Sequence, residues 1–424
     1  MASIFLPSSI RLSDLGYHSV AHVPVIFDSE HRYIREVNRY LRERATLDWH
    51  PSFPRGKNQA TVQRRKLNYP SQSTLKTTAY RLKNFIEWCD AVNLDWREAT
   101  YLEHLMKYRE HMASGVWSQD GDPLASGTIE LRIDSACEFL IWGTDRWIRS
   151  EFKMVTGTVA VSMKTGTGKN SSRSVTHRAG RKRQAPASLR LPEMDEINFW
   201  LKSIKTKKGY SKWLLCRFVL QTGCRAAEAV LFRSESLPPR EDWNLIGNQV
   251  TVRLKHGTKG GKERDIRIPV DFAIELDNYR SGRRLKSLSK LLKENKKSPH
   301  PPELFLSEYD GKPFSTTTLQ RTWKIGAPYS AWSPHLGRHS WACLTLLEHM
   351  EGEAQKYDEG NLAGMPEAFL WEAGRNAVQL HIQPQLGHVS DETTTQYLRW
   401  AIAVVASKDH HTSWHDELNE RESS

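Results

Sequence analysis

A strongly basic stretch near the middle of the sequence separates two parts with different patterns. No acidic residue occurs between residues 164 and 190, and Gly, Ser, Thr and Ala fill most of the remaining positions. Such a segment has too few apolar side chains to bury a core, so we predict a linker over 164–190. Its side chains either follow a phosphate backbone or are simply solvated. The basic residues are Lys164, Lys169, Arg173, Arg178, Arg181, Lys182, Arg183 and Arg190.

The part before this linker is predicted to be helical. Residues 1–70 show little periodicity beyond a short helix at about 31–42, and we predict an N-terminal arm there. Within 71–163, apolar residues recur at spacings of three and four, which is typical of helices with one buried face. The first such stripe comprises Leu75, Ala79, Leu82, Phe85, Ile86 and Cys89. Two further stripes follow, so we expect a helical domain with at least three helices.

The part after the linker is predicted to combine helices with one hairpin. An apolar helix is expected at about 213–220, and alternating apolar residues at 250–254 and 266–270 flank a turn with three glycines. We expect this domain to span 191–410 and a polar C-terminal tail to span 411–424. The predicted fold class is mainly α with a small antiparallel β-sheet.

The charge balance favours a polyanionic partner. The chain has 61 Lys and Arg residues against 49 Asp and Glu residues, which gives a formal net charge of +12 over 424 residues. Nucleic acid is therefore the leading candidate, ahead of a membrane surface. The sequence has no apolar run of the roughly 20 residues that a membrane helix needs, and no secretory signal at its N-terminus. We expect a cytoplasmic, nucleoid-associated protein without a membrane partner.

Two motifs in the second part carry charged side chains at characteristic positions. The pattern TGxRxxE contains Arg225 and Glu228, three residues apart at a predicted helix start. The pattern KGxKER contains Lys259 and Lys262 at the predicted hairpin tip. Taken singly, an Arg–Glu pair at this spacing is usually a surface ion pair, and a glycine-rich turn is usually only an exposed turn.

Two later motifs add histidines, a second arginine and a tyrosine. The pattern HxxR places His335 and Arg338 on one face of a predicted helix. The pattern LGHxxxxTTxxY contains His388 and Tyr397. A lone tyrosine more often packs and a lone histidine more often caps a helix, so it is the four motifs in this order that point to a reaction site.

In this order, the motifs resemble the active site of the tyrosine site-specific recombinases, the phage integrase family. The resemblance covers about residues 70–410. It implies a helical core-binding domain over 71–163 and a mixed α/β catalytic domain over 191–410, which clamp double-stranded DNA between them. It also implies cutting and rejoining of DNA through a 3′-phosphotyrosine intermediate, without ATP or another cofactor. The 50 residues from Arg338 to His388 exceed the gap in compact members, so we predict an insertion at about 348–384.

The resemblance implies a role for each motif residue. Tyr397 would be the nucleophile that attacks the scissile phosphate. Arg225 and Arg338 would each present a planar fork of donors to its non-bridging oxygens, which a lysine does with less geometric precision. Glu228 would orient Arg225 without reacting.

The remaining residues would move or donate protons. Lys259 would be the general acid for the 5′-hydroxyl, with Lys262 as the alternate, and His335 would take part in proton transfer with Tyr397. His388 would donate a hydrogen bond to the phosphate. Neither histidine lies in an HExxH motif or near a cysteine, so we predict no metal site. The five cysteines lack CxxC spacing and are expected to be reduced and buried.

We expect the protein to be an integrase or transposase of a mobile element. It would act as a homo-oligomer on DNA, with a dimer on each site and a tetramer in synapsis. Partner recombinases are a further possible requirement. A type IB topoisomerase-like enzyme and a catalytically silent DNA-binding accessory protein are the alternatives. The position of His335 and the compact motif around Tyr397 favour a recombinase. An apolar run at 400–406 suggests that residues 400–424 dock on a neighbouring protomer, with packing on the same domain as the alternative.

Overall fold

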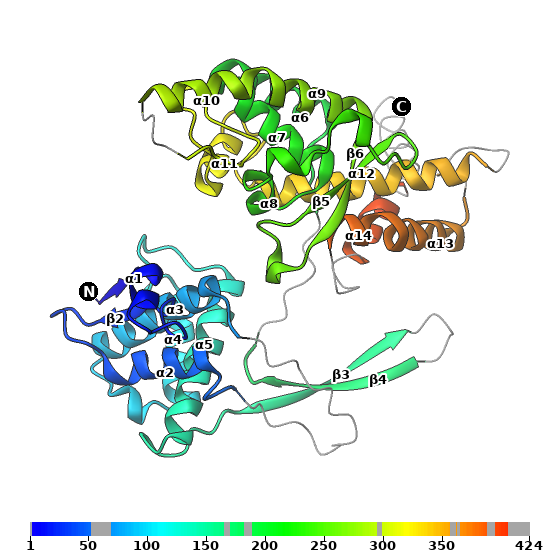
Figure 1. Ribbon diagram of the computed structural model, residues 1–424. Helices are drawn as coiled ribbons and strands as arrows, with labels where there is room; N and C mark the ends of the chain where they lie inside the picture. The colour runs from blue at the N-terminus through cyan, green and yellow to red at the C-terminus, as the bar shows by residue number, and fades with distance from the viewer. Residues whose placement is uncertain are drawn as a thin grey trace, which may run out of the picture. The chain divides into compact units, whose positions relative to one another are not determined.

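The computed structural model divides the chain into two compact units, with the boundary between Ala185 and Pro186 (Figure 1). The residues that it describes are 2–51, 69–164, 170–181, 189–294, 299–356, 362, 365–387 and 395–405. Within them, helices dominate and the strands form two-stranded antiparallel sheets, which confirms the predicted fold class. No helix in the described part of the chain is both long enough and apolar enough to cross a membrane.

The first unit is a set of packed helices with two small sheets. Its helices are α1 (Ser9–Asp14), α2 (Arg35–Thr46), α3 (Gln72–Ala91), α4 (Met106–Ala113) and α5 (Ser126–Asp145). A 3₁₀ turn, η1 (Trp96–Glu98), and a π-helical turn, η2 (Tyr101–Leu105), lie between α3 and α4. The sheets pair β1 (Ser3–Phe5) with β2 (Val25–Phe27) and β3 (Thr156–Lys164) with β4 (Asn170–Arg178).

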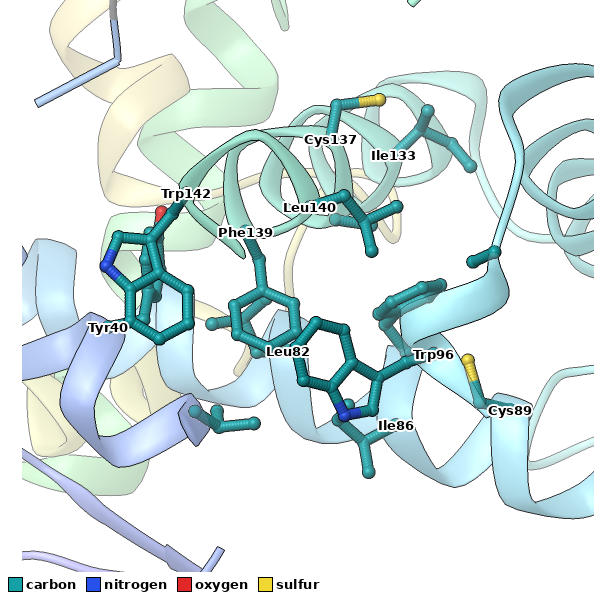
Figure 2. Packing of buried hydrophobic residues seen from close by; sticks show 14 of the residues in the cluster. Tyr40, Leu82, Ile86, Cys89, Trp96, Ile133, Cys137, Phe139, Leu140 and Trp142 are labelled. Atoms are coloured by element: carbon teal, nitrogen blue, oxygen red, sulfur yellow. The ribbon is translucent and has the colours of Figure 1, made fainter. Parts of the chain in front are cut away.

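Residues 2–51 belong to this unit and do not form the separate arm that the sequence suggested. Tyr40 of α2 packs against Phe139 and Trp142 of α5, with ring centroids 5.6 Å apart in both pairs (Figure 2). The Asn38 side chain bonds both backbone groups of Ile26, at 2.7 and 2.8 Å, and so ties α2 to β2. Helix α2 is too short for its periodicity to reveal these distant partners. Residues 52–68 lie outside the described residues.

The predicted linker is in part a β-hairpin joined to the first unit. Strands β3 and β4 pair one residue to one along their whole length. At the end of β4, Arg178 is buried and its guanidinium pairs with Glu130 and Asp134 of α5. In β3 only Ala160 separates Val159 from Val161, and β4 has the single Val175, so the sequence has too few alternating apolar residues to predict strands there. Residues 165–169 and 182–188 lie outside the described residues.

The second unit packs helices against one β-hairpin. Its longer helices are α6 (Met194–Lys208), α7 (Tyr210–Thr222), α9 (Val270–Ser281), α10 (Arg283–Glu294), α11 (Thr316–Trp323), α12 (Pro334–Ala354) and α13 (Glu367–Ala377). Shorter ones are α8 (Ala226–Val230), η3 (Ser234–Ser236), η4 (Arg240–Asp242), η5 (Lys259–Gly261), the π-helical η7 (Val378–Ile382) and α14 (Gln383–Leu386). The chain is also helical at 395–405. Strands β5 (Gln249–Leu254) and β6 (Arg264–Pro269) confirm the predicted hairpin.

One core of the second unit surrounds Tyr397, which exposes none of its surface. The segment 348–384, expected as an insertion, contributes Leu370 and Ile382 to this core. The apolar run after Tyr397 does the same through Ala401 and Val405, four residues apart on one helical face. Residues 400–405 therefore pack within their own protomer, and the expectation that they dock on a neighbour is wrong for them. Residues 406–424 lie outside the described residues.

The crossing of α13 and the helix at 395–405 yields a first prediction. Gly374 lies so close to Leu398 and Met350 that an added Cβ would overlap the Leu398 side chain. Gly374→Val should lower the free energy of unfolding of the full chain by about 1–3 kcal/mol, because extra carbons in a packed core force neighbours apart. Urea titration measures this change.

Gly352 supplies the matched control for this prediction. It lies in α12, and an added Cβ there would meet nothing within 4 Å. Gly352→Val should be neutral or slightly stabilising, since valine has the better helix propensity. Equal effects of the two substitutions would contradict the proposed close contact between α13 and the helix that carries Tyr397.

Candidate active site

The carboxylate of Glu228 is the centre of the candidate site. Gly223 ends α7 with a left-handed backbone conformation, φ +65°, and Arg225 then starts α8, which carries Glu228 in its first turn. The Glu228 side chain exposes none of its surface. One of its oxygens accepts the Arg225 backbone N–H at 2.7 Å, a common arrangement at a helix start. The other accepts Arg225 Nη1 at 3.0 Å.

A second arginine, Arg264 of β6, binds the same carboxylate. Arg264 Nη1 and Nη2 donate to the two oxygens of Glu228 at 2.5 and 2.7 Å, which is a bidentate pair. Its Nε donates to the carbonyl of Gln385 at 2.8 Å. Arg264 therefore links three segments that lie far apart in the sequence: α8, β6 and α14.

Arg338 of α12 lies beneath these groups and is only 2% exposed. Its Nη1 donates to the carbonyl of Gly223 at 2.7 Å, and its Nη2 donates to the carbonyl of Leu386 at 2.6 Å. Nη1 is also 3.9 Å from a Glu228 oxygen. The ends of α7 and α14 are thus fixed on either side of this guanidinium.

The described side chains of this cluster carry more positive than negative charge. Burial alone would raise the pKa of Glu228, but the hydrogen bonds and charge of Arg264, together with Arg225, hold it below its ordinary value. Burial lowers the pKa of Arg338 to about 10, and the charge of Arg225 adds to this effect. Arg338 therefore remains a cation at neutral pH. Among the described residues, one carboxylate faces three guanidiniums, and such a cluster suits an anionic ligand.

The hairpin tip approaches this cluster at Gly257. This residue has φ +70°, and an added Cβ would lie 2.6 Å from the carbonyl oxygen of Ala227, next to Glu228. The backbone of Lys259 follows two residues later in η5. The Lys259 side chain lies outside the described residues, and Lys262 is exposed.

Tyr397 joins the site through a chain of two histidines on α12. Its hydroxyl lies 2.9 Å from His339 Nδ1, and His339 Nε2 lies 3.0 Å from His335 Nε2. His339 is 7% exposed, whereas His335 reaches the surface. Burial, with the nearby His335 and Arg338, lowers the pKa of His339 to about 4. Burial raises the pKa of Tyr397, although Arg338 and Arg225 oppose the change.

The structure brings five of the residues predicted from the motifs into one site: Arg225, Glu228, His335, Arg338 and Tyr397. Lys169, Lys182, Arg183 and His388 lie outside the described residues, as do the side chains of Lys164, Arg173 and Lys259.

Arg178 departs from the prediction that it contacts DNA, because its ion pairs with Glu130 and Asp134 give it a structural role in the first unit. Arg181 is exposed, with its Nη2 3.9 Å from Asp134. It stays a candidate for a phosphate contact.

Sequence reasoning missed two residues of the site, Arg264 and His339. Both occur within motifs that were singled out. His339 follows His335 by four residues, which places the two on the same helical face and could have revealed it. Arg264 ends the hairpin-tip motif, but its pairing with Glu228 spans 36 residues and has no local signal.

Metal ligation finds no support among the described residues, which include no group of three or more His, Cys, Asp or Glu side chains placed to hold an ion. All five cysteines are buried and free, as predicted.

Comparisons with known proteins give structural likeness only. No family model matches the sequence, and no curated protein matches it. The chain is similar to XerH site-specific recombinase bound to a palindromic difH substrate, with a TM-score of 0.48 and 17% identity over 80% of this chain and 79% of the other. It is also similar to a lambda integrase dimer bound to a COC′ core site, with a TM-score of 0.44 and 15% identity over 78% and 89%.

A third structure with this likeness is the Tn1549 transposon integrase in complex with circular intermediate DNA, with a TM-score of 0.40 and 13% identity over 76% of this chain and 88% of the other. All three TM-scores lie below 0.5.

Removing the central carboxylate should destabilise the protein strongly. Glu228→Gln leaves three guanidiniums facing a neutral amide, and loss of one partner from a buried ion pair costs about 3–5 kcal/mol. Urea unfolding at neutral pH measures the change. Glu235→Gln is the matched control, because Glu235 pairs with Arg233 at 3.2 Å but is 72% exposed, so the change should be below about 1 kcal/mol.

The pH dependence of the stability of the parent protein and of Glu228→Gln tests whether charge causes the loss of stability. The pKa of Glu228 in the fold lies below its ordinary value of 4.5, so ionised Glu228 stabilises the fold above pH 4.5 and this contribution is lost as the pH falls through the lower, folded value. The stability difference between the parent and Glu228→Gln should therefore shrink in acid. A difference that stays constant with pH would show that packing, not charge, is responsible.

Proposed function

We propose that this chain is a tyrosine recombinase, an enzyme that cuts and rejoins DNA through a 3′-phosphotyrosine intermediate. The observation that carries the proposal is the cluster of Arg225, Arg264 and Arg338 around one buried carboxylate, with the hydroxyl of Tyr397 in the same site. A phosphodiester has the negative charge that such a cluster of guanidiniums attracts. A tyrosine hydroxyl is a nucleophile that can store the energy of the broken bond in a covalent link.

The proposed reaction assigns each group a part. The Tyr397 oxygen attacks phosphorus and loses its proton, and the bond from phosphorus to the 5′-oxygen breaks. Arg225 and Arg338 stabilise the charge that develops on the non-bridging oxygens. Lys259 gives a proton to the departing 5′-oxygen, and His388 donates a hydrogen bond to the phosphate. Attack by a 5′-hydroxyl on the phosphotyrosine reverses these steps and rejoins the strand.

The burial of the reacting groups adds a conformational step to this proposal. Tyr397 exposes none of its surface and Arg338 only 2%, whereas the Arg225 side chain is 29% exposed. Arg225 is therefore placed to meet the phosphate first. The surroundings of Tyr397 and Arg338 must then rearrange before the phosphate reaches them, so the free protein holds its nucleophile in a closed state.

The same proposal covers the biological setting. Each protomer has one Tyr397, so exchange of strands between two DNA sites requires several protomers on double-stranded DNA. A dimer on each site, a tetramer in synapsis and a role in integration or transposition of a mobile element fit this requirement. The exposed Arg181 and the other basic residues of 164–190, apart from the buried Arg178, would bind phosphates regardless of sequence.

Loss of the nucleophilic oxygen tests the proposal. Tyr397→Phe keeps the ring, so it should bind a duplex as tightly as the parent but form no covalent complex with it. The probe is a duplex selected from a random-sequence library by binding to Tyr397→Phe, then nicked near the cleavage position so that cut strands cannot rejoin. Adducts are counted on denaturing gels in the presence of EDTA. An adduct formed by Tyr397→Phe would contradict the assignment, and no adduct with the parent protein would favour a silent DNA-binding role.

The two lysines of the hairpin tip can be distinguished by the leaving group. Lys259→Ala should cleave the ordinary duplex at least about 10²-fold more slowly than the parent, the usual contribution of a general acid. It should recover on a duplex with sulfur at the 5′-bridging position, because a thiolate leaves without a proton. Lys262→Ala is the matched control and should need no rescue. The opposite pattern would assign the acid to Lys262.

A further inference from the structure

We propose that His339 accepts the proton of Tyr397 and passes it to His335, so that the two histidines form a proton relay from the buried nucleophile to the surface. This inference rests on the proposed function, because it concerns the step in which Tyr397 attacks phosphorus. It gives a reacting role to His339, to which the sequence motifs assign none.

The geometry of the three rings supports a continuous relay. His335 and His339 are four residues apart on α12, and their ring centroids lie 4.3 Å apart at 73°. The rings of His339 and Tyr397 are 5.4 Å apart at 56°. Both junctions are within hydrogen-bond distance, at 2.9 Å and 3.0 Å. The outer ring, His335, is exposed, so the relay ends where a proton can reach water.

The pairing of the two Nε2 atoms limits the arrangement of hydrogens. When both rings are neutral, one Nε2 must carry a hydrogen and the other must accept it. If His339 Nε2 is the donor, its Nδ1 has a lone pair that faces the Tyr397 hydroxyl. This is the arrangement in which His339 acts as a base.

The proton transfers then balance. The Tyr397 O–H bond breaks and a bond from hydrogen to His339 Nδ1 forms, while the electron pair stays on the tyrosine oxygen for attack on phosphorus. His339 Nε2 releases its hydrogen to His335 Nε2, and His335 Nδ1 releases one to water. When the strand is rejoined, the same steps in reverse return a proton to the Tyr397 oxygen.

Burial, together with the surrounding charges, keeps both histidines neutral until an anion binds. The charge of Arg338 acts on both histidines and on Tyr397, that of Arg225 acts on His335 and Tyr397, and the thiol of Cys343 also acts on Tyr397. Burial and these charges lower the pKa of both histidines, so each retains a lone pair at neutral pH. A phosphodiester bound to the arginines offsets their charge and makes both histidines better bases. Binding of the substrate therefore activates the relay.

The test compares rates of adduct formation on the nicked duplex described above. His339→Gln keeps a side chain that can bond to the Tyr397 hydroxyl but cannot take its proton. It should be about 10²-fold slower than the parent at neutral pH, within the range for general-base catalysis, and its rate should keep rising with pH where the parent levels off. Ser340→Ala, a buried neighbour on α12 that bonds the Leu336 carbonyl, is the matched control and should react like the parent.

A tyrosine with a more acidic hydroxyl distinguishes a loss of proton transfer from a defect in packing. With 3,5-difluorotyrosine at position 397, the hydroxyl loses its proton more readily, so the deficit of His339→Gln should shrink at least about tenfold. A packing defect would persist unchanged. If His339→Gln does not fold, as judged by circular dichroism, the exposed His335→Gln provides the same comparison with a smaller deficit.

The outcomes separate the relay from the function on which it rests. Parent-like rates and a parent-like pH profile for His339→Gln, in a protein that forms its adduct on Tyr397, would overturn the relay alone. A parent protein that forms no adduct at all would overturn the proposed function.

Discussion

The second unit depends on one buried carboxylate that faces three guanidiniums. Glu228 accepts hydrogen bonds from Arg264 of β6 and from Arg225 at the start of its own helix. Nη1 of Arg338 in α12 lies 3.9 Å from a Glu228 oxygen. Charges removed from water at this depth destabilise a protein by several kcal/mol unless each finds partners. Here the guanidiniums also bind the carbonyls of Gly223, Gln385 and Leu386, which end α7 and α14. The groups that would bind a phosphate are therefore the same groups that hold the segments of this unit together.

Under the proposed function, this arrangement would let a closed free state and a reactive bound state belong to one site. The described side chains of the cluster carry more positive than negative charge, and burial raises the pKa of Tyr397 further above neutral pH. In the proposed function, a phosphodiester that reaches Arg225 would add negative charge to this cluster. In the proposed reaction, the surroundings of Tyr397 and Arg338 then rearrange, and the added charge makes the histidines beside Tyr397 more basic. Binding of the substrate and activation of the nucleophile then have a single electrostatic cause.

The sequence predicted what depends on local pattern and failed where partners are distant. The hairpin and the helix that carries His335 and Arg338 follow from short spacings, as does the choice of Arg225 and Glu228. The structure places these four residues in one site. The role of Arg178 could not be predicted in this way, because its partners Glu130 and Asp134 lie 48 and 44 residues earlier in the chain. The first fifty residues were misjudged for the same reason, since α2 is defined by contacts with α5 about 100 residues later.

The most direct test of the account is the chemical identity of the protein–DNA link. The parent protein is reacted with the nicked duplex, digested with trypsin and nuclease, and the modified peptide is sequenced by mass spectrometry. The account predicts a nucleotide joined through its 3′-phosphate to the oxygen of Tyr397, in a peptide that ends at Arg399. Attachment to a histidine, a serine or another tyrosine would contradict it, as would a link through the 5′-phosphate.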